Sequence, residues 1–514
     1  MKSASVPVAV AVVLTVVVPR LIVLPLSVID WDESIFALVA QQMLAGHLPY
    51  DVVFDHKPIG LYLIFAGFFA VLGDSVGAIR TIPIVFVGGT AILLAWLSRR
   101  QFDMNALQAG LVAAMYGVLT LPNGGLATNT EILMNLFVVG AVALLIKGGL
   151  DRRVSLLYAL LTGFALGAVL QVNYLGGILV AGVAAFYLAW IYDGTRPAAE
   201  VLRLYFVNGM SIFTGFVLCN LMLVLPIIVA GNFAEYVGLQ RAYLGGYDPV
   251  GLSVQLDRLY RGGIALLPFL MLGAVFLFEG AHRLLVRRDR TPRGEAERRL
   301  RAWTVMWVFA LLAASASGRF YGHFFLFLLP SSLMLAAGLL WLCREQLLLR
   351  RGLTSWLVLM AAFTTLQHDG IFIQGARGYV NILRNHGPDI VARASAAMSA
   401  RLQAGETIYV YDAQPIHYFQ TRTVPPTRFA FPQHHLRQEE ALRLGIDRGA
   451  HMREILDARP RFIVVGGDPS DMAWGEASAL LAAALAEHYQ PTDIRSTRGS
   501  TAVAVFERKP PDPP

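Results

Sequence analysis

Ionisable side chains gather in one polar stretch near the start of the chain, residues 30–60. The stretch carries five carboxylates, two histidines and one lysine, namely Asp30, Asp32, Glu33, Asp51, Asp55, His47, His56 and Lys57. Apolar segments flank it on both sides, which predicts that these groups lie at a membrane face, where ionisable residues are costly and usually functional. A carboxylate in such a place can accept a proton from a hydroxyl, because partial burial raises its pKa towards neutrality.

Two motifs in this stretch each admit a functional and a structural interpretation. Asp32 and Glu33 open a predicted helix at 33–44, so they fit an N-cap pair as well as a general base. Lys57 follows His56 in a short turn at 54–58. An isolated cation beside a bilayer fits either a phosphate ligand or a lysine whose ammonium group reaches out to water.

Further polar residues stand in later turns on the same predicted side of the membrane. Glu131 opens a helix and is either a second site carboxylate or a charge that stabilises the first turn. The turn at 318–323 contains Arg319, Tyr321 and His323, which can bind a phosphate or form an interfacial aromatic belt. Two other outer-side residues are weaker candidates, for which an interfacial anchor is the preferred interpretation: Arg80 and, next to Asn173, Tyr174.

Composition places the chain among polytopic α-helical membrane proteins. Of its 514 residues, 56% are hydrophobic and only 15% charged, and the mean hydropathy is +0.56. Soluble domains carry about 25% charged residues. The net charge of +7 comes largely from arginines in short loops, which predict topology rather than nucleic-acid binding. Cys219 and Cys343 lie in apolar segments and imply no disulfide framework.

Apolar runs predict about eleven transmembrane helices. They lie at 8–29, 76–98, 105–121, 131–147, 154–170, 174–192, 204–230, 263–281, 302–318, 324–343 and 352–367. Basic loops, above all 282–301 with eight arginines against three acids, are assigned to the cytoplasm. The N-terminus is then cytoplasmic and everything after about 368 extracytoplasmic. The first helix is preferred over a cleaved signal peptide because no small-residue cleavage site follows it.

The chain divides into two predicted domains. Residues 1–367 form a membrane domain whose first outer loop, 30–75, holds two interfacial helices at 33–44 and 59–73. In the first of these helices Ile35, Phe36, Val39 and Met43 share a face, with Ser34 and Gln41 turned away. Residues 368–514 form a soluble α/β domain with strands at 407–412, 461–467 and 501–508 and helices at 389–403 and 475–488.

Several common sequence motifs for nucleotide, metal and hydrolase sites are absent. No nucleotide-binding loop, dinucleotide fingerprint, hydrolase elbow or zinc-ligand spacing occurs. No residue is therefore assigned as a metal ligand and no cofactor is required, although the outer-face acids admit a divalent cation.

The order of these motifs resembles the GT-C membrane glycosyltransferases, in particular the protein O-mannosyltransferase, aminoarabinose lipid A transferase and Rgt-like group. WDESIFALVAQQMLAG, FDHKPIGLYL, GRFYGHFFLFLLP and PPTRFAFP carry the resemblance. It implies an inverting transfer of a sugar from a polyprenyl phosphate donor, with Asp32 as general base beside Glu33. It also implies a carrier-phosphate contact by Lys57, a second-loop acid at Glu131, and phosphate and sugar contacts by Arg319 and His323.

Three positions depart from the relatives. Ile35 replaces an arginine of the aminoarabinose transferases, Asn173 replaces a lysine, and His56 replaces the acid before Lys-Pro. The first two weaken an aminoarabinose assignment.

The predicted activity is glycosyl transfer in the cell (inner) membrane. The partners are membrane lipids, a polyprenyl-phosphate-linked sugar and an envelope acceptor, which is lipopolysaccharide core, lipid A, another glycan or a protein. A transporter or flippase of lipid-linked sugars and a non-catalytic envelope assembly protein are the alternatives. Transporters tend to show inverted repeats and polar groups at the membrane midplane, neither of which appears here.

Overall fold

A computed structural model describes residues 6–150, 153–192, 196–244, 250–264, 267–282, 294–365, 380, 389–466, 475–496 and 503–510. Most of the predicted basic loop at 282–301 lies outside these residues. The chain forms two compact units. The first comprises residues 1–24, 80–225 and 249–377, and the second comprises 25–79, 226–248 and 378–514. The predicted division into domains 1–367 and 368–514 stays a prediction.

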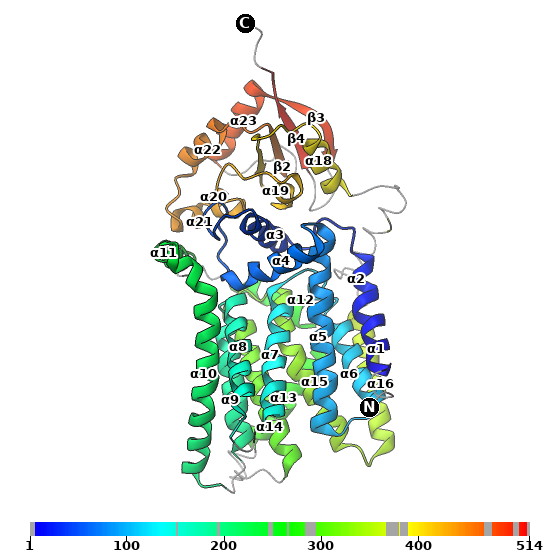
Figure 1. Ribbon diagram of the computed structural model, residues 1–514. Helices are drawn as coiled ribbons and strands as arrows, with labels where there is room; N and C mark the ends of the chain where they lie inside the picture. The colour runs from blue at the N-terminus through cyan, green and yellow to red at the C-terminus, as the bar shows by residue number, and fades with distance from the viewer. Residues whose placement is uncertain are drawn as a thin grey trace. The chain divides into compact units, whose positions relative to one another are not determined.

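Helices make up the first unit, and Figure 1 shows the long ones running alongside one another. They are α1 (Val6–Val12), η2 (Val13–Val17), α2 (Val18–Ile22), α5 (Val76–Phe102), α6 (Ala106–Leu119), α7 (Thr130–Gly148), α8 (Leu156–Val172), α9 (Gly176–Ile191), α10 (Ala198–Val229), α12 (Leu252–Ile264), α13 (Leu267–His282), α14 (Glu295–Ser315), η4 (Gly322–Leu328), α15 (Leu329–Leu342) and α16 (Leu347–Thr365). A helix is therefore present at each predicted span. Most of helix α12 lies outside the predicted spans.

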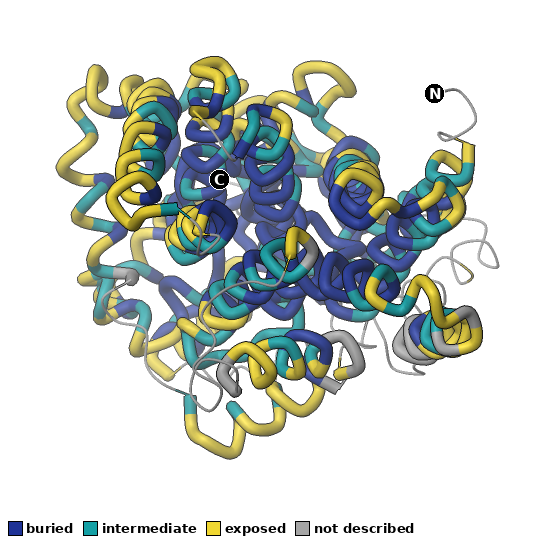
Figure 2. Tube along the Cα trace, turned by 90° about the horizontal axis from the view of Figure 1, so that it is seen from below, coloured by how far each residue is buried: buried dark blue, intermediate teal, exposed yellow. Residues whose placement is uncertain are grey.

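Four helical segments among the described residues are long and apolar enough to cross a membrane: α5, α7, α10 and Gly322–Leu342. In α10 only 17% of the apolar window is buried, and Phe206, Met210 and Leu221 are exposed. Exposed apolar surface of this extent is typical of a helix that contacts lipid or another protein. Figure 2 shows buried residues where helices meet and exposed residues on the outer rim.

The first helical segment contains a buried arginine whose polar atoms find partners in the bundle. The Arg20 guanidinium donates to Thr120 Oγ1 at 2.9 Å and to the Gly125 carbonyl at 2.6 Å. A buried cation without such acceptors would be costly. Together with the packing of α1 and η2 against α6, these bonds make residues 6–22 part of the bundle.

The second unit combines helices with one four-stranded sheet. Its helices are α3 (Trp31–Leu44), α4 (Ile59–Leu72), α11 (Phe233–Leu244), α18 (Ile390–Ser399), α19 (Ile416–Thr421), α20 (Gln433–Leu436), α21 (Gln438–Arg443), α22 (Arg448–Asp457) and α23 (Glu476–His488). The strands β1 (Ile408–Tyr411), β2 (Phe462–Gly466), β3 (Tyr489–Ser496) and β4 (Val503–Arg508) lie in the order β1-β2-β4-β3. Strand β2 runs parallel to β1 and antiparallel to β4, with Val464 opposite both Val410 and Val505.

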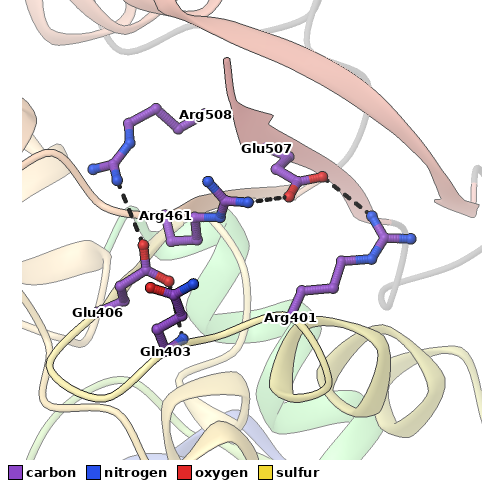
Figure 3. A network of polar contacts seen from close by, with 6 residues as sticks. All are labelled: Arg401, Gln403, Glu406, Arg461, Glu507 and Arg508. Carbon is purple, nitrogen blue, oxygen red and sulfur yellow. Dashed lines mark hydrogen bonds and ion pairs between the residues drawn. The ribbon is translucent and has the colours of Figure 1, made fainter. Parts of the chain in front are cut away.

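Apolar burial holds this sheet together, and ion pairs surround its edge. Tyr409, Ile463 and Leu481 are fully buried in its core. Glu507 accepts from Arg461 at 2.7 Å and from Arg401 at 3.1 Å, and Arg508 pairs with Glu406 at 3.5 Å (Figure 3). Partly exposed ion pairs contribute about 0–1 kcal/mol each to the free energy of unfolding, so most of the stability of this sheet comes from its apolar core.

The three predicted strands and two predicted helices of this region are confirmed. Strand β3 was missed because it contains Pro491, lacks an apolar alternation and lies at the sheet edge, where proline is tolerated.

One prediction about the loop is wrong. Helix α3 is not amphipathic, because every residue from Glu33 to Gln42 is buried, including Ser34 and Gln41. Helices α4 and α19 pack against it. The Gln41 amide donates to Asp74 Oδ2 at 2.8 Å and to the Phe419 carbonyl at 3.1 Å, which satisfies its donors inside the unit.

Candidate active site

The second unit contains the first predicted carboxylates, at the start of α3. Asp30 is the N-cap, and its side chain accepts from the Asp32 backbone N–H at 3.1 Å. Glu33 completes a capping box, because its Oε1 accepts from the backbone N–H groups of Ile29 at 2.9 Å and Asp30 at 3.3 Å. Asp32 lies between them in the first turn and is only partly buried. Glu33 therefore has a structural role at the start of α3.

The turn that carries Lys57 is held by two tyrosines. Tyr50 donates its hydroxyl to the Lys57 carbonyl at 2.7 Å, and the Tyr62 hydroxyl lies 3.2 Å from the same oxygen. Tyr50 has a φ of +72°, a conformation that few bulky residues adopt and that costs energy. The turn is also paired with the C-terminal part of the unit, since the Phe54 N–H donates to the Arg428 carbonyl at 2.7 Å. The ammonium group of Lys57 is thus carried on a fixed backbone.

His56, the residue before Lys57, lies beside a buried carboxylate, Asp55, and a second histidine, His434. Asp55 is 2% exposed and accepts from Tyr62 at 2.8 Å, and its other oxygen lies 3.1 Å from His56 Nδ1. Burial opposes the charge on Asp55, but His56, Lys57 and His434 together hold its pKa below the usual range. Burial lowers the pKa of His434 to about 3, so its imidazole is neutral at physiological pH.

In the first unit, Glu131 belongs to a chain of hydrogen bonds. The Thr130 hydroxyl donates to Glu131 Oε1 at 3.1 Å, and the Asn173 amide donates to the same hydroxyl at 3.0 Å. Asn173 also accepts from the Leu175 N–H, which fixes the turn that carries Tyr174. Asn173 thus connects the α8–α9 turn to the start of α7. Glu131 is therefore buried and hydrogen-bonded, unlike an exposed first-turn carboxylate that interacts only with the helix dipole.

Arg319, Tyr321 and His323 lie together in the turn at 318–323, and Arg258 from α12 contacts the same turn. The rings of Tyr321 and His323 stack at 5.6 Å between centroids, and Arg319 Nη1 lies 3.5 Å from the Tyr321 hydroxyl. The Arg258 guanidinium lies 4.5 Å from the centre of the Tyr321 ring, and it donates to the Arg319 carbonyl at 3.3 Å. The backbone is bent sharply here, since Gly318 and Phe320 both have positive φ values. Two arginines therefore flank one tyrosine.

Arg80 differs from its expected role as an interfacial anchor. An anchor arginine keeps its guanidinium in water, but Arg80 is 1% exposed within the first turns of α5. A buried guanidinium needs anionic or carbonyl partners. The expectation of an anchor is therefore wrong for this residue, and its role as a site cation stays a prediction.

The predicted residues thus form two sets. Asp32, Glu33, His56 and Lys57 belong to the second unit. The first unit holds Arg80, Glu131, Tyr174, Arg319, Tyr321 and His323.

Arg258 and His434 are not among the residues predicted from the sequence. The helix that carries Arg258 has strong apolar periodicity and could have been found. Nothing local to His434 marks it, because its neighbours Asp55 and His56 are distant in sequence.

Comparisons with known proteins give the fold. No family model and no curated protein matches the chain. ArnT from Cupriavidus metallidurans bound to undecaprenyl phosphate matches with a TM-score of 0.58 and 12% identity, over 96% of this chain and 97% of that one. The apo state of the same ArnT matches with a TM-score of 0.52 and 13% identity, over 97% and 98%. The predicted polytopic helical membrane fold and its resemblance to this transferase group are confirmed at the level of the fold.

Proposed function

We propose that the chain is an integral-membrane glycosyltransferase that moves a sugar from a polyprenyl-phosphate donor to a cell-envelope acceptor. The observation that carries this proposal is the fold shared over nearly the whole chain with ArnT, a GT-C aminoarabinose lipid A transferase, in its complex with undecaprenyl phosphate. The sequence motifs at 31–60 and 318–330 support the same assignment independently.

Asp32 is the general base of the proposed reaction. It takes the proton of the acceptor hydroxyl, whose oxygen bonds to the anomeric carbon while the bond from that carbon to the carrier phosphate breaks. A single displacement of this kind inverts the anomeric centre. Asp30 and Glu33 form a capping box that fixes the first turn of α3, which carries Asp32.

Cations stabilise the departing polyprenyl phosphate in this proposal. Lys57, Arg319 and Arg80 are the predicted ligands, and the contacts of Arg258 with Tyr321 and the Arg319 carbonyl add it to the set. Each preorganised contact to developing charge contributes about 2.7–4 kcal/mol in sites of this type.

The remaining predicted residues contact the sugar or the carrier. Glu131 presents a carboxylate held by Thr130, and Tyr174 follows the asparagine that bonds to the same threonine. Tyr321 and His323 offer a hydroxyl and an imidazole from one stacked pair. His56 occupies the position before Lys57.

The proposed topology has eleven membrane spans in a cell (inner) membrane. The N-terminus is cytoplasmic, and the domain at 368–514 is extracytoplasmic together with the 30–75 loop. The basic loops support this orientation.

Mass spectrometry of envelope glycolipids and glycans tests the proposal. Cells lacking the protein should lose one sugar substituent, and wild type should restore it. Asp32→Asn should fail to restore it, since loss of a general base lowers the rate by about 10²–10⁴-fold. Asp51→Asn, which changes an exposed carboxylate of the same loop, is the matched control and should restore the sugar.

Equal restoration by wild type and Asp32→Asn would remove Asp32 from the chemistry. An unchanged glycan profile in the deletion strain would contradict the transferase assignment itself. Membrane levels of each variant, measured by immunoblot, separate lost chemistry from lost protein.

A further inference from the structure

Asp55, His56 and His434 form a cluster with the composition of a metal site. Each offers one ligand atom, and these atoms all lie within 4.8 Å of one another. Asp55 and His56 come from the turn before α4, whereas His434 comes from α20, so only the tertiary fold of the second unit brings them together.

The surroundings of the cluster are those of a built site rather than of a surface patch. Asp55 and His434 are 2% and 1% exposed, and the side chain of His56 is 15% exposed. The His434 ring packs between Phe54 and Phe431, with centroids 5.3 and 5.4 Å away. These aromatic contacts hold the imidazole in one orientation, which a metal ligand requires.

The distances fit a tetrahedral ion after small side-chain rotations. Zinc bonds to nitrogen and oxygen are about 2.0–2.2 Å, so neighbouring ligand atoms of a tetrahedron are about 3.3 Å apart. His56 Nδ1 and Asp55 Oδ1 are already 3.1 Å apart. The Tyr62 hydroxyl holds the second oxygen of Asp55 at 2.8 Å, in the manner of an outer-shell partner that orients a ligand.

The donor set indicates the class of metal. Two imidazoles and one carboxylate suit Zn²⁺ and similar transition-metal ions, whereas Ca²⁺ and Mg²⁺ prefer oxygen ligands throughout. A hydrogen-bonded Asp55–His56 pair is the simpler interpretation, but it gives no reason for His434 to lie within ligand distance of both.

We propose that Asp55, His56 and His434 bind one Zn²⁺-class ion that fastens the turn carrying Lys57 to helix α20. Three protein ligands leave a coordination position for water. The ion would fix the backbone from which Lys57 projects and would connect the first loop to the C-terminal part of the second unit. The inference stands apart from the transferase proposal, because metal binding is measured without donor or acceptor.

Metal titration of the full-length protein tests this site. Protein purified through a tag without histidines, and freed of metal with a chelator, is titrated with Zn²⁺ and with Co²⁺ as a spectroscopic substitute. Wild type should bind one equivalent, with the visible spectrum of four-coordinate Co²⁺. His434→Gln and Asp55→Asn should each weaken binding at least tenfold, since loss of an outer-shell partner alone costs about 10–100-fold.

Two further variants complete the design. His435→Gln is the matched control, because His435 is equally buried beside His434 but bonds to the Tyr409 hydroxyl at 3.0 Å and lies outside the cluster. It should retain the metal. Tyr62→Phe removes only the hydroxyl that orients Asp55 and should weaken binding with little change in packing.

Three results would overturn the proposal: no stoichiometric binding by folded wild type, full binding by both His434→Gln and Asp55→Asn, or equal losses in His434→Gln and His435→Gln. Circular dichroism without metal identifies unfolded variants. If the buried substitutions unfold the protein, His56→Gln at the partly exposed ligand replaces them, and unchanged Zn²⁺ affinity in that variant contradicts the site.

Discussion

Adjacent carboxylates at the start of α3 have different partners, and this difference can be measured. Glu33 is buried and accepts two backbone N–H groups, so Glu33→Ala leaves both donors without their acceptor. We expect a loss of about 1–3 kcal/mol in the local opening free energy of α3. Asp32→Asn removes a first-turn charge, whose interaction with the helix dipole contributes about 0.3–1 kcal/mol.

Hydrogen–deuterium exchange of peptides covering 27–45 measures both effects in the folded protein. Faster exchange in Glu33→Ala than in Asp32→Asn is the expected order. The reverse order would show that the Asp32 carboxylate, rather than Glu33, supports the helix start.

Sequence reasoning at this scale identified candidate residues more easily than their contacts. Paired acids before an apolar run predict either a cap or a base, and only the structure shows that Asp30 with Glu33 makes the cap. The contacts of Arg258 and His434 could not be predicted, because their partners Tyr321 and Asp55 come from distant parts of the chain. Local pattern does not encode such tertiary neighbours.

A buried histidine in α19 makes the second unit sensitive to acid. Burial lowers the pKa of His417 from 6.5 to about 4, against a smaller opposing effect of Asp389, and Ser395 bonds to its Nδ1 at 2.9 Å. The unfolded chain therefore takes up a proton at a higher pH than the folded one. Stability is fully present above pH 6.5 and is lost as the pH falls towards 4, by on the order of 3 kcal/mol.

Melting temperatures between pH 8 and pH 4 give the measurement, followed by intrinsic fluorescence. His417→Asn keeps a polar group near Ser395 but does not titrate, so its melting temperature should fall less steeply over this range. Parallel curves for the two proteins would exclude His417 as a source of the acid sensitivity.

At the scale of elements, the packing of α3 depends on one buried amide. Gln41 donates to Asp74 and to the Phe419 carbonyl, so Gln41→Glu replaces a donor by a negative charge facing two acceptors. Truncated or mismatched buried polar groups cost about 1–3 kcal/mol, and more when charged. We expect a marked fall in melting temperature at neutral pH.

Asp74→Asn provides the matched control for that change. Combined with Gln41→Glu it removes one of the two negative charges and supplies a donor, so the double variant should recover part of the loss. Full additivity of the two single effects would show that residues 41 and 74 do not interact.

Element boundaries followed the strength of the local signal. Apolar runs predicted the long helices, because a continuous apolar run of about 20 residues is typical of a membrane-spanning helix. Strands β1, β2 and β4 were predicted from their β-branched and aromatic residues. Helix α3 had an apparent polar face that proved to be buried, because α4 and α19 cover the side expected to face water. The residue pattern of α3 could not show that residues 416–421, which are distant in sequence, pack against this helix.

The whole molecule has an asymmetric charge distribution, and this asymmetry predicts its orientation. Arg99 and Arg100 end α5 in a basic loop that the positive-inside rule assigns to the cytoplasm. Glu487, at the exposed end of α23, belongs to the region assigned to the outside.

Single-cysteine variants at Arg100 and Glu487, with Cys219 and Cys343 replaced by alanine, report each side. A membrane-impermeant maleimide should label Glu487→Cys in cells whose inner membrane is intact, and Arg100→Cys only after lysis. Labelling in the opposite order would invert the topology and place the Asp32 loop in the cytoplasm, where the proposed extracytoplasmic transfer could not occur.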